Sequence, residues 1–311
     1  MSATLRLGTR GSRLALIQSN LVAAALASAG FEVELVTIVT SGDMRRPDTA
    51  WGEGAFVGAL ETALLSGEID LAVHSAKDVP IEPEDDLAIA AYPVRADARD
   101  ALVGRDGASA TTLAALPAGS VIGTDSQRRT GFMLAERSDV RLVPLIGNVD
   151  TRLAKLDRGD ADALVLAVAG LARLGRADRI SEKLAVEAAP PAPGQGALAV
   201  QVRASDMALR RSLAAIDDAA TRVAVVAERE VLRLSGGGCR APLGAFGAID
   251  GHVLTLTAGV VDPSGSGRRI VRRSGPVQEA MTLAAAVADE LLPDRRWPMP
   301  EPRPRGQESP V

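Results

Sequence analysis

The sequence predicts an α/β protein with two lobes of mostly parallel sheet and a smaller α+β domain near its C-terminal end. Three observations lead to this fold class. Short apolar segments alternate with helical segments over residues 4–91, and the alternation returns over residues 100–168. A stretch dense in proline and glycine, at 188–196, then breaks the pattern before one more apolar strand. Beyond residue 219 the pattern changes to helix, strand and helix.

The first run opens with a strand and an amphipathic helix. Leu14, Ile17 and Leu21 recur at helical spacing, and Gly30 lies just past the end of that segment, where helices often stop. A glycine-rich loop at Trp51–Gly58 follows the second strand. The expected elements of this run are strands at Leu5–Gly8, Glu32–Val39, Ile69–Val73 and Leu87–Ala91 and helices at Arg13–Ala29 and Phe56–Leu65.

The second run repeats the pattern with short strands separated by helical segments. We interpret the stretch AAPPAPGQG after it as a crossover that returns the chain to the first lobe. The expected strands are Ala101–Val103, Ser120–Gly123, Arg141–Leu145 and Ala163–Val168, and after the crossover Ala197–Val202. In the last part we expect a helix at Ala219–Ser235, a strand at Leu254–Val261 and a helix at Gln278–Leu292.

These elements predict three domains. The first is discontinuous and comprises residues 1–95 and 197–214, the second comprises residues 100–190, and the third comprises residues 219–292. Residues 293–311 are rich in proline and arginine and lack periodicity, so we expect a disordered tail there.

The composition excludes several classes of function. The chain has 311 residues, a formal charge of −4 and 2% aromatic residues, which argues against nucleic-acid binding and against a membrane-interface belt. The single cysteine, Cys239, allows no intrachain disulfide and fits a reducing cytoplasm. With only His74 and His252 beside it, no metal cluster is expected. Polar residues interrupt the apolar stretch near the N-terminus, so we expect no secretory signal there.

Arginines recur directly after predicted strands, where open α/β sheets bind their ligands. Ser12 is placed to cap the first helix, and Asp150 is the expected cap of a later one. Because guanidinium groups pair bidentately with carboxylates and phosphates, several of them at strand ends predict a site for a polyanion. The alternative is a set of solvated surface arginines. The residues concerned are Arg10, Arg128, Arg152 and Arg173.

Two further segments carry reactive groups. In the segment HSAKDVP, Asp78 follows a strand and can act as an acid, a base or a stabiliser of positive charge. A structural role as a helix cap with a neighbouring salt bridge explains it equally well, and we expect His74 to be a structural residue. Cys239 lies in the small-residue loop GGGCRAP, where it is either an inert thiol or a reactive one beside Arg240.

With these motifs in view, the chain resembles the porphobilinogen deaminase (hydroxymethylbilane synthase) family over residues 4–292. The resemblance rests on seven segments in order: LRLGTRGSRLAL, VHSAKDVP, LPAGSVIGTDSQRRT, GNVDTRLAKLDRG, LAVAGLARLG, PAPGQGA and GGGCRAPLG. It implies that the first two domains resemble a type II periplasmic-binding-protein clamp. It also implies a cytoplasmic, monomeric transferase that joins four porphobilinogen molecules, with loss of ammonia, and releases hydroxymethylbilane.

The resemblance also implies roles for individual residues. Asp78 matches the catalytic aspartate, and Cys239 matches the cysteine that carries a dipyrromethane cofactor through a thioether. Other positions match residues that hold the cofactor, namely Ser75, Lys77, Ser126, Arg128 and Arg129. Positions that match residues engaging the substrate or the growing chain are Arg10, Ser12, Gln18, Arg152 and Arg173. No metal, nucleic acid or membrane is implied.

Four positions depart from the family pattern. Ile146 stands where arginine is usual, Glu53 and Gly58 stand where lysine is common, and Asp125 replaces a serine. Each change weakens the binding of anions. A catalytically impaired or binding-only homologue is therefore an alternative function, and a secreted solute-binding protein is a third alternative.

Overall fold

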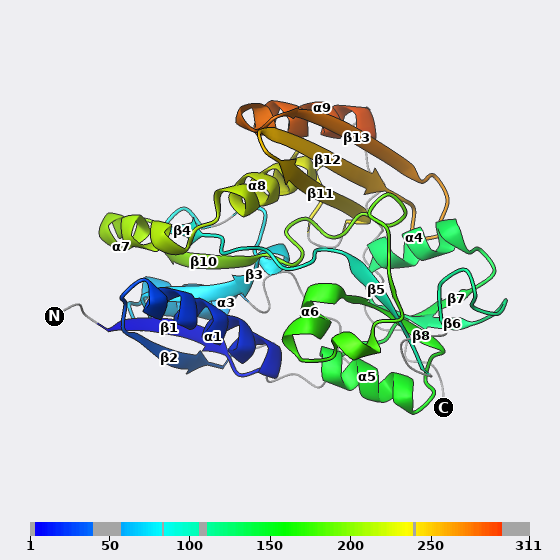
Figure 1. Cartoon of the computed structure of the whole chain (residues 1–311), viewed down its shortest axis with the longest axis horizontal. Coiled ribbons are helices and arrows are strands. Elements are labelled where there is room, and N and C mark those ends of the chain that lie inside the picture. Colours follow the sequence, from blue (N-terminus) through cyan, green and yellow to red (C-terminus); the bar gives the residue numbers. More distant parts are fainter. Residues whose placement is uncertain (1–3, 40–56, 83, 106–110, 239–240, 294–311) are drawn as a thin grey trace, which may run out of the picture.

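The structure, a computed structural model, describes residues 4–39, 57–82, 84–105, 111–238 and 241–293. Three sheets organise this part of the chain (Figure 1). Cys239, Glu53, most of the predicted glycine-rich loop and the predicted tail beyond residue 293 lie outside the described residues.

The first sheet, with its helices, forms lobe 1. Its strand order is β2-β1-β3-β10-β4, and only β10 runs against the other four strands. Leucine and valine side chains of β1, β3 and β10 pack against α1 to form its core. The strands are β1 (Leu5–Arg10), β2 (Val33–Ile38), β3 (Leu71–Ser75), β4 (Leu87–Ala91) and β10 (Leu198–Arg203), and the helices are α1 (Arg13–Ser28), α3 (Gly58–Leu65) and α7 (Met207–Ser212).

The second sheet, with its helices, forms lobe 2 and repeats this topology. Its strand order is β7-β6-β8-β5-β9, and only β5 runs against the others. The described residues of both lobes therefore confirm the prediction of mostly parallel sheets. The strands are β5 (Asp100–Gly104), β6 (Val121–Gly123), β7 (Arg141–Val143), β8 (Ala163–Ala167) and β9 (Glu182–Lys183), and the helices are α4 (Gln127–Glu136), α5 (Val149–Asp157) and α6 (Val168–Arg173).

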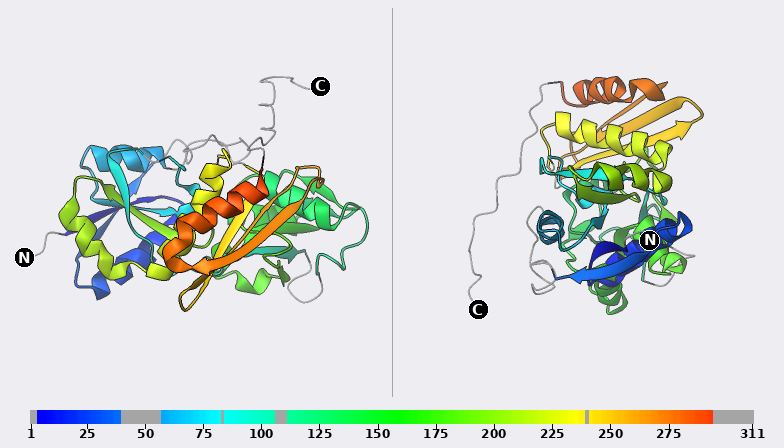
Figure 2. Two further views of the ribbon diagram at one scale, coloured as in Figure 1. Left: turned by 90° about the horizontal axis from the view of Figure 1, so that it is seen from above. Right: turned by 90° about the vertical axis from the view of Figure 1, so that its left-hand side faces the viewer.

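The third sheet is an antiparallel meander of β11, β12 and β13. Helices α8 and α9 pack on it through a core of alanine, valine and leucine, and the whole unit lies above the junction of the two lobes (Figures 1 and 2). Only β12 was predicted here, so the sequence-based count of strands was too low. The elements are α8 (Ala219–Leu234), β11 (Leu243–Asp250), β12 (Val253–Val260), β13 (Arg269–Pro276) and α9 (Ala280–Leu291); the short 3-10 helices of the molecule are η1 (Ala76–Asp78), η2 (Ala177–Arg179), η3 (Leu213–Ile216) and η4 (Val277–Glu279).

Two chain segments connect the lobes, and they touch each other. Residues 92–99 lead from β4 to β5, and residues 184–197 lead from β9 back to β10. The Ala96 N–H donates to the Gly196 carbonyl oxygen at 3.2 Å. Gly196 has a φ of 86°, and a Cβ there would lie 2.5 Å from the Ala96 oxygen, so only glycine allows this approach. The pair of segments forms the hinge between the lobes.

Within the described ranges, no helix has the length and apolar character that crossing a bilayer requires. The same residues contain no group of three or more His, Cys, Asp or Glu side chains that could hold a metal ion.

Candidate active site

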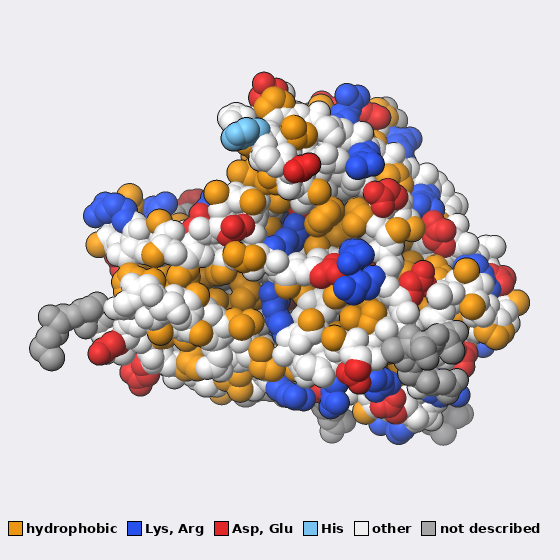
Figure 3. Space-filling view, in the orientation of Figure 1, with side chains coloured by type: hydrophobic (Ala, Val, Ile, Leu, Met, Phe, Trp, Pro, Cys, Tyr) orange, Lys and Arg blue, Asp and Glu red, His pale blue; other side chains and the backbone are white. Residues whose placement is uncertain are grey.

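A cavity of about 420 Å³ lies between the two lobes. Its walls are the ends of β1, β3 and β8 and the starts of α1, α5 and α6, and Lys and Arg side chains are visible in the groove between the lobes in Figure 3. Among the described residues that line it, six are cationic and two are carboxylates. The cations are Arg10, Arg13, Lys77, Arg129, Arg152 and Arg173, and the carboxylates are Asp78 and Asp150.

The helices at the cavity are capped by short polar side chains. The Ser12 Oγ accepts from the Ala15 N–H at the start of α1, as predicted. At the start of α5 the cap is Asn148, whose Oδ1 accepts from the Thr151 N–H at 2.8 Å. The prediction that Asp150 caps this helix was therefore wrong, because the asparagine two residues earlier already occupies the cap position.

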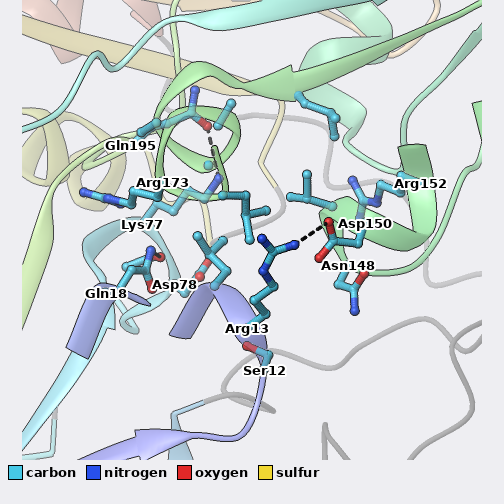
Figure 4. A pocket seen from close by; sticks show the side chains of 18 of the residues that line it. Ser12, Arg13, Gln18, Lys77, Asp78, Asn148, Asp150, Arg152, Arg173 and Gln195 are labelled. Carbon is cyan, nitrogen blue, oxygen red and sulfur yellow. Dashed lines mark hydrogen bonds and ion pairs between the residues drawn. The ribbon is translucent and has the colours of Figure 1, made fainter. Parts of the chain in front are cut away.

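Asp78 ends the short helix η1, directly after β3, and its side chain is directed into the cavity (Figure 4). It caps no helix, since Ser75 occupies the position before η1. Asp78 is exposed on its cavity side, while protein surrounds its carboxyl on the other sides. This burial raises the pKa of the Asp78 carboxyl above its ordinary value, while the charges of Lys77 and Arg10 oppose the rise.

Lys77 lies beside Asp78 and points toward the hinge. Its Nζ donates to the Gln195 Oε1 at 3.1 Å. Burial lowers the pKa of Lys77 to about 8, with the Asp78 charge opposing and the Arg129 charge reinforcing the change. Lys77 is therefore a cation at neutral pH that loses its charge in mildly alkaline solution.

A buried ionic network lies behind this lysine. Asp100 is enclosed in the protein and forms ion pairs with Arg129 at 2.7 Å and with Arg128 at 2.8 Å. Burial alone would raise the pKa of Asp100, but the two guanidinium groups hold it below its ordinary value. The Gln195 Nε2 also donates to the Asp100 Oδ1 at 2.8 Å. Gln195 thus connects Lys77 of lobe 1 with the ionic network of lobe 2.

The cofactor positions expected from the resemblance are only partly brought together. Ser75, Lys77 and Arg129 line the cavity, whereas Ser126 and Arg128 are not among its lining residues. The side chain of Arg128 is 4% exposed and donates to the Pro190 carbonyl oxygen at 2.7 Å. Ser126 caps α4, where its Oγ accepts from the Arg129 N–H at 3.4 Å.

The substrate positions expected from the resemblance all line the cavity, and these are Arg10, Ser12, Gln18, Arg152 and Arg173. The Gln18 Nε2 donates to the Ser75 Oγ at 3.0 Å, which fixes both side chains on the wall of lobe 1. Arg152 and Arg173 each donate at 2.7 Å to a glycine carbonyl, those of Gly147 and Gly196.

Burial lowers the pKa of Arg152 and of Arg173 to about 10, so both are charged at neutral pH. A guanidinium has five N–H donors, and both groups have further donors to offer a ligand in the cavity. An enclosed set of cations of this kind fits a ligand with several carboxylates.

Comparison with known proteins decides the family. Two family models match, described as porphobilinogen deaminase, dipyromethane cofactor binding domain, over residues 5–211, and porphobilinogen deaminase, C-terminal domain, over residues 222–293. The chain belongs to the porphobilinogen deaminase family. It is 47% identical over 297 residues to the porphobilinogen deaminase of Roseiflexus sp. (strain RS-1), with 94% of this chain and 97% of the relative covered. For the enzyme of Leifsonia xyli subsp. xyli the identity is 48% over 269 residues, covering 84% of this chain and 81% of the relative.

Two solved structures show partial likeness to this chain. The VFT2 domain of Bordetella pertussis BvgS, as a double mutant, has a TM-score of 0.43 and 16% identity, covering 68% of this chain and 86% of that domain. The methionine binding protein MetQ has a TM-score of 0.43 and 14% identity, covering 76% of this chain and 98% of that protein.

Among the other positions singled out in the sequence, those that the structure describes do not line the cavity. His74 is buried, its Nε2 pairs with the Gln201 Oε1 at 2.9 Å, and burial lowers its pKa to about 4, so it is a neutral structural residue as predicted. Gly58 is the first residue of α3 and is exposed. The backbone oxygen of Ile146 accepts from the Lys155 Nζ at 3.2 Å. Cys239 and Glu53 lie outside the described residues.

Three residues that belong to the site were not predicted from the sequence. Asp100 and Gln195 organise the buried network, and Arg13 lines the cavity. The position of Gln195 between two glycines of the crossover could have drawn attention to it. Its side-chain partners, however, are about 100 residues away in the sequence. Arg13 follows Ser12 directly and could have been included with the other strand-end arginines.

Proposed function

We propose that this protein deaminates porphobilinogen and joins four molecules of it head to tail, releasing hydroxymethylbilane. The observation that carries the proposal is the Asp78 carboxylate, which follows strand β3 and lies among six cations of the cavity lining, in a chain of the porphobilinogen deaminase family. The matching family model is that of a dipyrromethane cofactor binding domain, so dipyrromethane is the cofactor. We propose that Cys239 carries it through a thioether.

The chemistry of the substrate explains the charge of the cavity. Each porphobilinogen carries an acetate and a propionate, so the growing chain is a polycarboxylate. Loss of ammonia from porphobilinogen leaves a resonance-stabilised methylene-pyrrolenine cation. When bound, the cofactor supplies the terminal pyrrole whose α-carbon attacks this cation and then loses a proton. The site must therefore bind many carboxylates and stabilise one transient cation.

Asp78 is the group that meets the second requirement. As a carboxylate in the cleft it can accept the pyrrole N–H of the substrate and lie beside the cation that forms when ammonia leaves. Its raised pKa brings the carboxyl closer to the range in which it can also take up and return a proton. Ionised Asp78 is the active form, because only the anion stabilises positive charge.

The cations meet the first requirement. We propose that Lys77 and Arg129, with Ser75, hold the carboxylates of the cofactor, and that Ser126 and Arg128 act behind them. Arg128 and Arg129 share Asp100, so Arg128 supports the position of Arg129 through that carboxylate. The residues we propose for the substrate and the growing chain are Arg10, Ser12, Gln18, Arg152 and Arg173.

The wider biology follows as part of the same proposal. The three sheets support the predicted domains at 1–95 with 197–214, 100–190 and 219–292. We propose a monomer that acts in the cytoplasm on a small-molecule substrate, without nucleic acid and without a membrane partner.

The intact mass of the protein, before and after porphobilinogen is added, tests the proposal. The wild type should carry the mass of a dipyrromethane and should then gain a ladder of pyrrole units with release of ammonia. Cys239→Ala should lack the dipyrromethane mass. Asp78→Ala should keep the adduct and lose turnover, whereas the control Asp85→Ala, at an exposed carboxylate outside the cavity lining, should behave as wild type.

The same measurement separates the proposal from a binding-only homologue, which the departure at Ile146 suggests. Such a homologue would bind porphobilinogen without releasing ammonia and without a ladder. An adduct with no ladder in the wild type would mean that elongation is blocked, and near-normal product formation by Asp78→Ala would refute the role given to that residue.

A further inference from the structure

An ion pair crosses the cavity from one lobe to the other. Arg13 is the first residue of α1 in lobe 1, and Asp150 is the second residue of α5 in lobe 2. The Arg13 Nη1 lies 3.6 Å from the Asp150 Oδ1, and both side chains point into the cavity (Figure 4). The two side chains are 58% and 38% exposed. No role in the site was expected for Arg13, although it contributes one of the six cations of the cavity lining.

The stability of helix α1 does not account for an arginine at this position. The N-terminal end of a helix carries partial positive charge, so a cation in the first turn is unfavourable there. The Ser12 side chain already caps α1, and no acidic residue lies in its first turn. Asp150 is the opposite case, because a carboxylate in the first turn of α5 is favourable for that helix. The stability of α5 thus accounts for an aspartate at position 150. An arginine at position 13 is accounted for only by the groups that it faces in the cavity.

The contact between the two groups is of a kind that another carboxylate can replace. A pair that is largely open to solvent, at 3.6 Å, is weakly held and is screened by salt. The acetate and propionate of porphobilinogen present the same functional group as Asp150 and are delivered to the same cavity. Arg13 offers them a planar fork at the cavity, opposite the wall that holds Arg152.

We propose that Arg13 binds a carboxylate of the incoming porphobilinogen or of the growing chain, and that Asp150 is the competing anion which this carboxylate displaces. The inference rests on the proposed function and adds a specificity residue to it. The proposed role of Arg13 also relates to the departure from the family pattern at Ile146. Where the resemblance leads us to expect arginine, lobe 2 has Ile146, which offers no cation, and Arg13 supplies one from the opposite lobe.

Two measurements on the full-length protein test this inference. The first is calorimetric binding of a pyrrole that carries the acetate and propionate but lacks the aminomethyl group, so that it cannot lose ammonia. The second is the KM and kcat for porphobilinogen, read together with the mass ladder. The variants are Arg13→Gln, Asp150→Asn and their combination, with Arg158→Gln as a matched control. Arg158 lies in lobe 2, where its exposed guanidinium pairs with Asp160 at 3.1 Å, and it does not line the cavity.

Arg13→Gln should weaken binding of the pyrrole and raise the KM about tenfold at low salt, with kcat within about twofold of wild type. Asp150→Asn should strengthen binding, because the competing anion is gone. The double variant should match Arg13→Gln, since Asp150 acts only through the arginine. Arg158→Gln should leave all three quantities unchanged. Thermal unfolding of each variant should remain near that of the wild type, as expected for an exposed pair.

Two outcomes would overturn the inference. Unchanged binding and KM in Arg13→Gln would mean that the arginine makes no contact with the ligand. Equal losses in Arg13→Gln and Asp150→Asn, with no further loss in the double variant, would identify the pair as a contact that holds the lobes together. A wild type that releases no ammonia would refute the proposed function instead, and the binding measurement with the unreactive pyrrole would still decide whether Arg13 binds carboxylates.

Discussion

Replacing Glu228 should destabilise the protein more than any substitution on its surface. Glu228 lies on α8, is fully buried, and accepts hydrogen bonds from three parts of the chain. Its carboxylate takes two from Arg95, at 2.5 and 3.0 Å, one from the Gly194 N–H at 2.7 Å and one from the Gly247 N–H at 2.8 Å. Both hinge segments and the third sheet therefore meet at one side chain.

The expected cost follows from what the substitution leaves behind. Glu228→Ala leaves a guanidinium that is only 10% exposed without its counter-ion, and breaking one partner of a buried pair costs about 3–5 kcal/mol. The two glycine N–H groups lose their acceptor as well, at about 1–3 kcal/mol each unless water reaches them. The loss of unfolding free energy should therefore be at least about 3 kcal/mol.

Urea unfolding, followed by circular dichroism, measures this cost, and a double-mutant cycle with Arg95→Met shows its origin. If the cost arises from an unpaired buried charge, the combination of Glu228→Met and Arg95→Met should lose clearly less free energy than the two single losses added together. A loss below about 1 kcal/mol for Glu228→Ala, or strict additivity in the cycle, would refute the reasoning.

Further predictions concern the site and the packing around it. Because burial lowers the pKa of Lys77 to about 8, the affinity of the cofactor-free protein for a dipyrromethane that carries the same carboxylates should fall as the pH rises through 8, and Lys77→Arg should remove this dependence in calorimetric titrations. Between about pH 8 and 10, Lys77 is neutral in the folded protein but still protonated in the unfolded chain, so the unfolded state binds more protons. The contribution of Lys77 to the free energy of unfolding should therefore increase with pH over that interval, and the urea concentration at the midpoint of unfolding should increase with it. Turnover should fall at acid pH as Asp78 is protonated, with a midpoint above that of an ordinary aspartate, and a midpoint below it would contradict the raised pKa. Gly244→Ala should lower the free energy of unfolding by about 1–3 kcal/mol, since a Cβ there would lie 2.0 Å from the Pro190 carbonyl oxygen; unchanged stability would show that the backbone yields easily. Ile146→Arg should add a charge-assisted contact of about 1.5–3 kcal/mol to a carboxylate and speed elongation in the mass ladder, and an unchanged rate would mean that another cation already fills that role.

Lobe 1 was predictable because its strands are apolar and because recognisable residues mark where its first helix begins and ends. Residues 71–74 of β3 are all buried, and the helix at 13–28 has its serine cap and a glycine two residues past its end. The third sheet was not predictable in the same way. In β11 the sequence LGAFGAID contains two glycines and two alanines, which have low strand propensity. In β13 four consecutive polar and glycine residues, all exposed or half-buried, precede the final Pro276. Both strands exist because the apolar face of β12 and the helices give them a surface to pack on.

Some residues of the site could likewise be predicted from the sequence, and others could not. Arginines at strand ends were predicted to converge, and Arg10, Arg152 and Arg173 do line one cavity. Arg128 does not line it, because its side chain turns to Asp100, a partner 28 residues away that no local pattern indicates. Pairings between the lobes, such as Arg13 with Asp150, depend on how the two lobes face each other, and that arrangement is set by the tertiary structure.

The position of β10 in the first sheet sets the order in which the two lobes can fold during synthesis. Lobe 2 is a continuous stretch whose strands are complete by residue 183, whereas the first sheet needs residues 198–203, which are made more than 100 residues after its own β4. On the ribosome, the edges of β3 and β4 that pair with β10 therefore stay unpaired while the second lobe emerges and folds. A nascent chain halted before β10 leaves the tunnel should protect lobe 2 from protease and leave the N-terminal third open to cleavage.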